Sequence, residues 1–187
     1  MTVDVDHSRV PVSPDACHSA FEAIPHLATL SAADCAELAP LLSVHEFPAG
    51  STLFYEDDES GAAYFLSSGA IEVFKSNPEG KKLPLVVLRD GGLLGEIGLL
   101  IGESRTATAR ALGNVVVFEL ERDTFDAALE SGNIAAMRLS LAFARVLAQR
   151  LTATNEKMFE LFQSDVSDEL HSQLSELQTR LLTRWTG

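Results

Sequence analysis

The sequence contains few of the residues that build cross-links, metal clusters or membrane spans. It has two cysteines, Cys17 and Cys35, which are too few for a disulfide framework or a four-cysteine cluster. Its five histidines are scattered, and the adjacent pair Cys17-His18 supplies only two candidate ligands, so we predict no metal site. No apolar run approaches the roughly 18 residues that span a bilayer, and we expect no membrane partner.

Basic residues are scarce as well. The chain has 14 lysines and arginines against 27 aspartates and glutamates, and its formal net charge is −13. Proteins that bind nucleic acid neutralise phosphates with basic side chains, so this balance predicts no DNA partner. The stretch 164–187 is also short for a winged helix-turn-helix domain. The first residues lack the charged and then apolar pattern of a signal peptide, which predicts a cytoplasmic protein.

The hydrophobic periodicity changes along the chain. Residues 1–20 contain prolines and scattered small polar residues, and we expect them to be disordered. Residues 21–44 contain a helix with Ser31 as its N-cap. Residues 45–122 form short alternating segments separated by turns rich in Gly, Pro and Asn, which predicts a β-barrel or β-sandwich.

Helical periodicity returns in residues 134–162, which carry two apolar stripes. One stripe supplies a face for packing on the barrel. The other repeats in steps of four and three, which favours a homodimeric coiled coil, and a single helix packed on its own barrel is the alternative. Residues 164–187 predict a further amphipathic helix that packs on its own dimer, pairs with its copy or binds a partner protein. The coiled-coil stripe consists of Leu147, Leu151, Thr154, Met158 and Leu161.

The stretch from Leu94 to Ala109 reads LGEIGLLIGESRTATA and carries the most specific chemistry of the chain. Gly95 predicts a turn that opens one short helical turn, whose orphan backbone N–H groups attract an anion. Gly95 and Gly98 let that backbone approach a ligand closely. Arg105 offers a charged donor fork for phosphate oxygens, and Glu96 is an acceptor for a ribose hydroxyl.

Each of these residues has a simpler interpretation when it is taken alone. Arg105 is then an ordinary surface arginine, and Glu96 is a carboxylate that stabilises the first turn of a helix. Their combination with two glycines at this spacing instead favours a pocket for a ligand with one negative charge and a free hydroxyl.

The pattern resembles the phosphate-binding cassette of cyclic nucleotide-binding domains. The family pattern G-E-[IL]-[GA]-L-L, followed after a gap by R-[TS]-A-x-A, is present as Gly95–Leu100 and Arg105–Ala109, with Ser104 where many members have proline. Phe47–Leu53 and Phe65–Val73 also fit family stretches. The resemblance implies an α+β fold, an eight-stranded antiparallel β-roll of the jelly-roll type with an N-terminal helix and a long C-terminal dimerisation helix.

The implied domain covers residues 21–163, between the disordered residues 1–20 and the C-terminal amphipathic helix of residues 164–187. The family has a Gly-Asp pair near residue 57, where this chain has Asp57-Asp58. Because aspartate tolerates the left-handed backbone conformation, we expect the turn to be kept.

The resemblance also assigns roles around the ligand. Arg105 holds the cyclic phosphate with backbone N–H groups near Gly98 and Ala107, and Thr106 donates to the same phosphate. A threonine at this position favours guanine in some relatives, so cGMP is a second candidate beside cAMP.

By the same resemblance, Glu96 and Gly95 hold the ribose 2′-hydroxyl, and Leu85 packs against the sugar or the base. The predicted ligand-binding set of the roll is therefore Gly95, Glu96, Ile97, Gly98, Arg105, Thr106, Ala107 and Leu85.

The long helix carries a second resemblance. Arg150–Lys157 reads RLTATNEK, and it is similar to R-L-x-V-T-S-E-K in the dimer helix of the catabolite activator protein, a member of the family. There the threonine and the serine meet the purine base, the serine from the partner subunit. Thr154 and Asn155 match these positions, and the Asn155 amide both donates and accepts hydrogen bonds. The alternative role of Thr154 is to set the register of a coiled coil.

We therefore predict a stand-alone dimeric sensor that binds a cyclic nucleotide, cAMP first, and acts through an unidentified protein partner. The homodimer forms through residues 134–162. The alternative is a ligand-free scaffold of the same fold that mediates protein–protein interaction. We expect no enzyme, such as a phosphodiesterase, and no cofactor, because the sequence offers neither a metal cluster nor a paired nucleophile and base.

Overall fold

The computed structural model describes residues 10–77, 79–89 and 91–163, with side chains up to residue 160. The described chain divides between Ala144 and Arg145 into two compact units. The helices are α1 (Pro14–Glu22), α2 (Ala32–Leu38), α3 (Glu96–Ile101), α4 (Arg122–Glu130) and α5 (Ile134–Gln163), with 3-10 turns at Leu27–Thr29 and Ala39–Leu41. The strands are β1 (Val10–Pro11), β2 (Leu42–Phe47), β3 (Thr52–Phe54), β4 (Ala62–Ser68), β5 (Ile71–Ser76), β6 (Lys82–Leu88), β7 (Leu93–Leu94), β8 (Thr108–Ala111) and β9 (Val115–Glu121).

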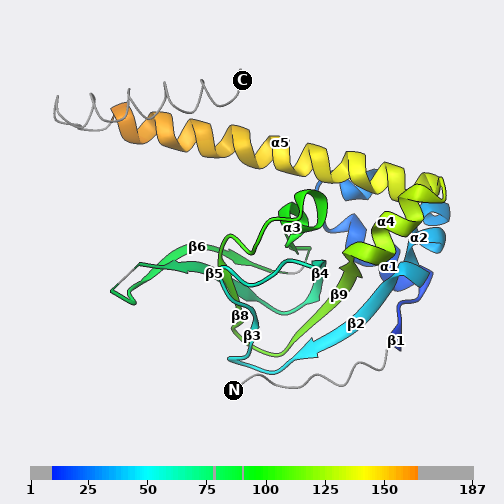
Figure 1. Cartoon of the computed structure of the whole chain (residues 1–187), viewed down its shortest axis with the longest axis horizontal. Helices are drawn as coiled ribbons and strands as arrows, with labels where there is room; N and C mark the ends of the chain where they lie inside the picture. Colours follow the sequence, from blue (N-terminus) through cyan, green and yellow to red (C-terminus); the bar gives the residue numbers. More distant parts are fainter. Residues whose placement is uncertain (1–9, 78, 90, 164–187) are drawn as a thin grey trace. The chain divides into compact units, whose positions relative to one another are not determined.

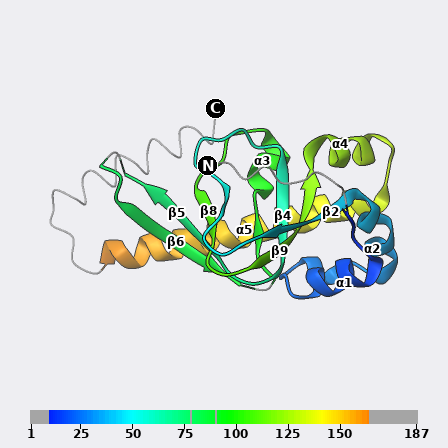
Figure 2. The same cartoon turned by 90° about the horizontal axis from the view of Figure 1, so that it is seen from below.

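The strands form two antiparallel sheets. One has the order β1-β2-β9-β4-β7 and the other the order β3-β8-β5-β6. Helices α1, α2 and α4 gather at one end of the strands, and the β5–β6 hairpin projects at the other (Figures 1 and 2). The predicted β-roll with its N-terminal helix and long final helix is confirmed, with nine described strands instead of eight.

The strand sequences alternate, and each face of the larger sheet therefore meets a different layer. One face packs against the opposite sheet in a core of small and branched residues. On the other face Phe65 contacts Phe21 of α1 at a centroid distance of 4.7 Å and Phe143 of α5 at 6.0 Å. One face of β4 therefore packs against the opposite sheet, and the other face packs against helices α1 and α5. The core between the sheets consists of Leu66, Ile71, Leu94, Ala109, Ala111, Val115 and Val117.

The expectation of disorder is wrong for residues 10–20, which form β1 and the start of α1. The reason is local capping chemistry. Ser13 accepts a hydrogen bond from the backbone N–H of Ala16, and Pro14 occupies the first helical turn, where its missing N–H costs nothing. The apolar face of this helix, Cys17 and Phe21, is buried. Residues 1–9 lie outside the described residues, as does the predicted helix of residues 164–187.

The second unit is described from Arg145 to Gln163, as the continuation of α5. Every described side chain from Ala148 to Glu160 is exposed. Leu151 and Met158 of the predicted coiled-coil stripe belong to this exposed surface, whereas the side chain of Leu161 is not described. Within the described residues, no helix combines the length and apolar character that crossing a membrane requires.

Candidate functional site

The predicted turn and short helix of the cassette are present as α3. Gly95 precedes the helix with φ of +80° and Gly102 follows it with φ of +75°, both in the left-handed region that glycine adopts without strain. The N–H of Leu99 donates to the Gly95 carbonyl at 3.1 Å, and the N–H of Gly102 to the Gly98 carbonyl at 3.0 Å. Two glycines therefore fix both ends of a six-residue helix.

The same stretch is packed too closely for side chains at two positions. A Cβ on Gly95 would collide with Nη1 of Arg105 and lie 2.7 Å from the Ala62 carbonyl oxygen. A Cβ on Gly98 would collide with the hydroxyl of Ser60. The glycines thus let the cassette backbone lie directly against its own protein neighbours.

Arg105 is buried, with 6% of its surface exposed, so it is not the surface arginine of the simpler interpretation. Its Nη1 donates to the carbonyl of Ala62 at 2.7 Å. The guanidinium carbon lies 4.2 Å from the ring centroid of Phe54 and 5.5 Å from that of Tyr64. Among the described residues its Nε is buried without a hydrogen-bond partner. The arginine is oriented by one carbonyl and two rings, with donor capacity left for a ligand.

The environment of Arg105 is rich in acidic groups. Burial lowers the pKa of Arg105, and this effect is opposed by Tyr64 and by the nearby carboxylates Glu119, Asp58 and Glu96. Glu96 is itself only 3% exposed. A buried cation beside a buried carboxylate is the pairing that the sequence predicts for a ligand with one negative charge and a free hydroxyl.

The loop at residue 57 completes this side of the site. Asp57 has φ of +69°, so the predicted retention of the left-handed turn is confirmed. The backbone N–H of Asp57 donates to the Arg105 carbonyl, and the N–H of Arg105 donates to the Asp58 carbonyl, both at 2.9 Å. This exchange of hydrogen bonds joins the loop to an arginine that lies 47 positions after Asp58 in the sequence.

The other predicted residues occupy different surroundings. Ile97 is half-buried, Ala107 is buried and Thr106 is exposed beside Arg105 in sequence. Leu85 lies on the edge strand β6, at an irregularity of its pairing with β5, and is 57% exposed. The last two predicted residues, Thr154 and Asn155, are exposed in the second unit.

Several residues of the site carry no signal in the sequence. Phe54 and Tyr64 lie outside the cassette pattern, yet both rings contact Arg105. Tyr64 also lies opposite Glu119 in the β4–β9 pairing, and Glu119 pairs with His45 at 2.6 Å between Nε2 and Oε2. These contacts follow from strand register, which single-sequence patterns do not specify.

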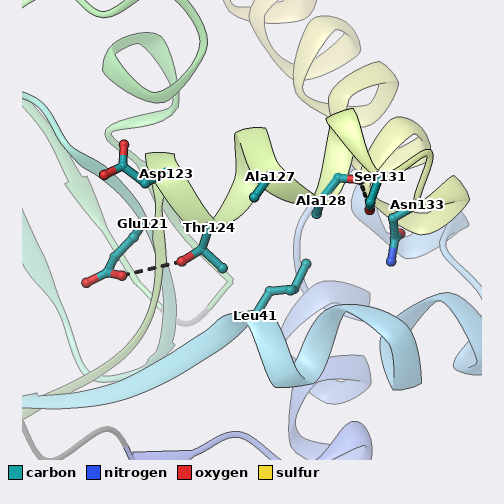
Figure 3. Close-up of a pocket in the computed structure, with 8 residues that line it drawn as sticks. All are labelled: Leu41, Glu121, Asp123, Thr124, Ala127, Ala128, Ser131 and Asn133. Atoms are coloured by element: carbon teal, nitrogen blue, oxygen red, sulfur yellow. Dashed lines mark hydrogen bonds between the residues drawn. The ribbon is translucent and has the colours of Figure 1, made fainter.

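A separate hollow lies outside the cassette. It lies between α4 and Leu41, the last residue of the 3-10 turn Ala39–Leu41 (Figure 3). No cassette residue contributes to it, and its polar contacts are internal, such as the bond between the Thr124 hydroxyl and Glu121. Its lining is Leu41, Glu121, Asp123, Thr124, Ala127, Ala128, Ser131 and Asn133.

Comparison with known proteins identifies the fold and the cassette together. Residues 44–131, which run from β2 through the cassette to the end of α4, match the family described as "Cyclic nucleotide-binding domain". Residues 44–131 therefore belong to the cyclic nucleotide-binding domain family. The predicted family resemblance is therefore confirmed.

Related regulators extend this match. The chain is 29% identical over 152 residues to the CRP-like cAMP-activated global transcriptional regulator of Mycobacterium tuberculosis, covering 81% of this chain and 66% of that protein. It is 31% identical over 135 residues to the cAMP-activated global transcriptional regulator CRP of Escherichia coli, covering 72% and 62%. The structure of the Thermus thermophilus catabolite activator protein superposes with a TM-score of 0.64 at 26% identity, covering 73% and 62%. The chain thus spans less than two thirds of the length of these relatives.

Proposed function

We propose that this protein binds a 3′,5′-cyclic nucleotide, with cAMP as the first candidate, in the pocket formed by the cassette. The observation that carries the proposal is the buried Arg105, held by Ala62, Phe54 and Tyr64 beside the buried Glu96. In this arrangement Arg105 and the cassette N–H groups bind the cyclic phosphate, and Glu96 accepts the 2′-hydroxyl of the ribose.

The names of the relatives favour cAMP over other cyclic nucleotides, since two of them are described as cAMP-activated regulators. Thr106, exposed beside Arg105, keeps cGMP as the second candidate. Thr154 and Asn155 on the long helix are proposed to contact the base. Leu85 on β6 is proposed to lie against the sugar or the base.

We further propose that the protein is a homodimer and that its output is another protein. The exposed Leu151 and Met158, at coiled-coil spacing with Leu147 and Thr154, support pairing of two α5 helices. The net charge of −13 disfavours direct contact of these 187 residues with DNA phosphates. Sedimentation at micromolar concentration tests the dimer, and a monomer there contradicts the coiled-coil part of the proposal.

Ligand binding is tested by thermal unfolding with cAMP, cGMP and the acyclic control 5′-AMP. A ligand at about 100 times its dissociation constant stabilises the folded state by about 2.7 kcal/mol. For a protein of this size that corresponds to a rise of about 5–10 °C in melting temperature. We expect this rise with cAMP and a smaller one or none with 5′-AMP.

The ligand-free scaffold is the competing function, and it predicts no shift with any of the three nucleotides at millimolar concentration.

A further ligand separates the role of Glu96 from the binding of the phosphate. Cyclic 2′-deoxy-AMP lacks the hydroxyl assigned to this carboxylate, so we expect it to bind about 10- to 100-fold more weakly than cAMP. Equal affinity for the two nucleotides contradicts the assignment of Glu96.

A further inference from the structure

Arg122 contacts the cassette helix from the side of α4. It is the first residue of α4 and follows β9 directly. Its Nη2 donates to the carbonyl oxygen of Gly98 and, at 3.2 Å, to that of Leu99. The guanidinium therefore binds two successive peptide carbonyls of α3, and one of them belongs to the glycine that packs against Ser60.

The short length of α3 explains why these carbonyls are available. The carbonyls of the last helical turn carry the negative end of the helix dipole, and a carbonyl oxygen has two lone pairs, so the Gly98 carbonyl accepts from the Gly102 N–H and from Arg122 together. Gly102 ends the helix, and a Cβ there would lie 2.5 Å from Nη1 of Arg122. Gly102 thus leaves the space that the guanidinium fills. Both bonds come from Nη2, whose two N–H groups are fixed in the guanidinium plane, whereas the N–H groups of a lysine ammonium rotate freely.

The backbone of Arg122 is also hydrogen-bonded, to the segment of residues 60–62. Its N–H donates to the Gly61 carbonyl at 2.8 Å. The neighbouring Ala62 carbonyl accepts from Arg105, and the neighbouring Ser60 hydroxyl packs against Gly98. Residues 60–62 consequently contact both arginines and the cassette helix.

Arg122 also begins the helix that leads to α5. In the same α4, Phe125 is buried, and its ring lies 6.1 Å from that of Phe143 in the first unit's part of α5. Two hydrogen bonds from the Arg122 side chain therefore link α3 to α4, so that a displacement of α3 would act on α4. The aromatic contact connects α4 to α5 in turn.

We propose that Arg122 is a positioning residue of the nucleotide site, whose guanidinium fixes the end of α3 and couples it to α4. The proposal rests on the proposed function, because coupling to a ligand requires that the cassette bind one. A cation that merely caps a helix stabilises the fold equally with and without ligand. A coupling residue changes the affinity of the site and the response of α4 together.

The test compares Arg122→Met, which removes the donors but keeps an unbranched side chain, with the unmodified full chain. Hydrogen exchange is measured in α3 and α4, with and without saturating cAMP. Arg138→Gln is the matched control, because it removes another arginine whose Nη1 pairs with Asp34 at 2.6 Å and which does not contact α3. In Arg122→Met we expect faster exchange of α3 without ligand, about tenfold weaker cAMP binding and loss of the ligand-induced change in α4.

The outcomes separate the two proposals. If the unmodified protein binds no cyclic nucleotide, the proposed function fails and the coupling role fails with it; faster exchange of α3 in ligand-free Arg122→Met then shows only that the guanidinium stabilises the helix. If Arg122→Met binds cAMP and protects α4 as the unmodified protein does, the inference is overturned. Should that variant not fold, Arg122→Lys keeps the charge without the fork. We expect it to loosen α3 to an intermediate degree, and exchange identical to the unmodified protein overturns the proposal.

Discussion

The cassette and the two polar residues of α5 belong to one proposed ligand site, but the structure holds them in different ways. Arg105 is bound to a carbonyl 43 residues away and lies over two aromatic rings. Thr154 is exposed, and its hydroxyl donates to the carbonyl of Arg150, four residues earlier in the same helix, at 2.8 Å. The roll thus orients Arg105 through distant segments of the chain, whereas the Thr154 hydroxyl is bonded to a carbonyl of its own helix. Preorganised groups lose less entropy on binding, so we expect the roll to dominate affinity.

The largest expected effect comes from Arg105→Ala. It removes the charged partner of the ligand phosphate, and losing one member of such a buried pair costs about 2–5 kcal/mol, or at least about 30-fold in affinity. The melting shift with cAMP should vanish at concentrations that saturate the unmodified protein. Arg105→Lys keeps the charge but not the donor fork, and we expect an intermediate loss. Normal binding by Arg105→Ala contradicts the assignment of the site.

The next effect concerns the tight packing of the cassette. Gly98→Ala places a methyl group on the Ser60 side chain, and such overpacking costs about 1–3 kcal/mol of unfolding free energy. Chemical denaturation measures the loss. Gly113→Ala is the matched control, since a Cβ added to Gly113 would meet no atom within 4 Å. The double variant Gly98→Ala with Ser60→Gly removes the clash and should recover most of the stability; no recovery contradicts the packing argument.

The comparison also shows which of these features a sequence can reveal. The ends of α3, the left-handed turn at Asp57 and the Ser31 cap are predictable, because each depends on residues within a few positions of one another. The capping of α1 by Ser13 is equally local. The prolines of this stretch nevertheless favour disorder on composition alone, although Pro14 in fact occupies the first turn of the helix.

Long-range contacts are not predictable in the same way. Phe54 and Tyr64 lie over Arg105 because β3 and β4 pair with β8 and β9 in particular registers. The bond from Arg122 to α3 likewise depends on where α4 begins in space. The sequence pattern indicates that Arg105 binds an anion, but the groups that hold it come from segments more than 40 residues away.

A smaller effect is expected from Thr154→Ala. One neutral hydrogen bond to the base contributes about 0.5–1.5 kcal/mol, which is roughly a 2- to 12-fold change in affinity. Thr152→Ala is a close control, because the Thr152 hydroxyl makes the same kind of bond to the Ala148 carbonyl at 3.0 Å. Equal affinities in the two variants assign Thr154 to the register of a coiled coil instead. A loss as large as that of Arg105→Ala contradicts the dominance of the roll.

The smallest effect concerns pH. The hydrogen bond that His45 donates to the Glu119 carboxylate raises the pKa of His45 above its ordinary value of 6.5, against the opposing effect of burial. A histidine whose folded pKa is raised contributes stability that is fully present below the unfolded pKa and is lost as pH rises through the folded pKa. The denaturant concentration at the unfolding midpoint should therefore decrease as the pH rises from about 6.5 to 8. The decrease should be smaller in His45→Gln. Identical pH profiles for the two proteins contradict this contribution.

Equilibrium dialysis with labelled cAMP tests the central claim most directly, because it measures occupancy without depending on stability or heat. For the folded, unmodified chain we predict saturable binding that approaches one nucleotide per chain, and no saturable binding to Arg105→Ala. If the unmodified chain binds neither cAMP nor cGMP at millimolar concentration, the cassette of this protein is not a nucleotide site.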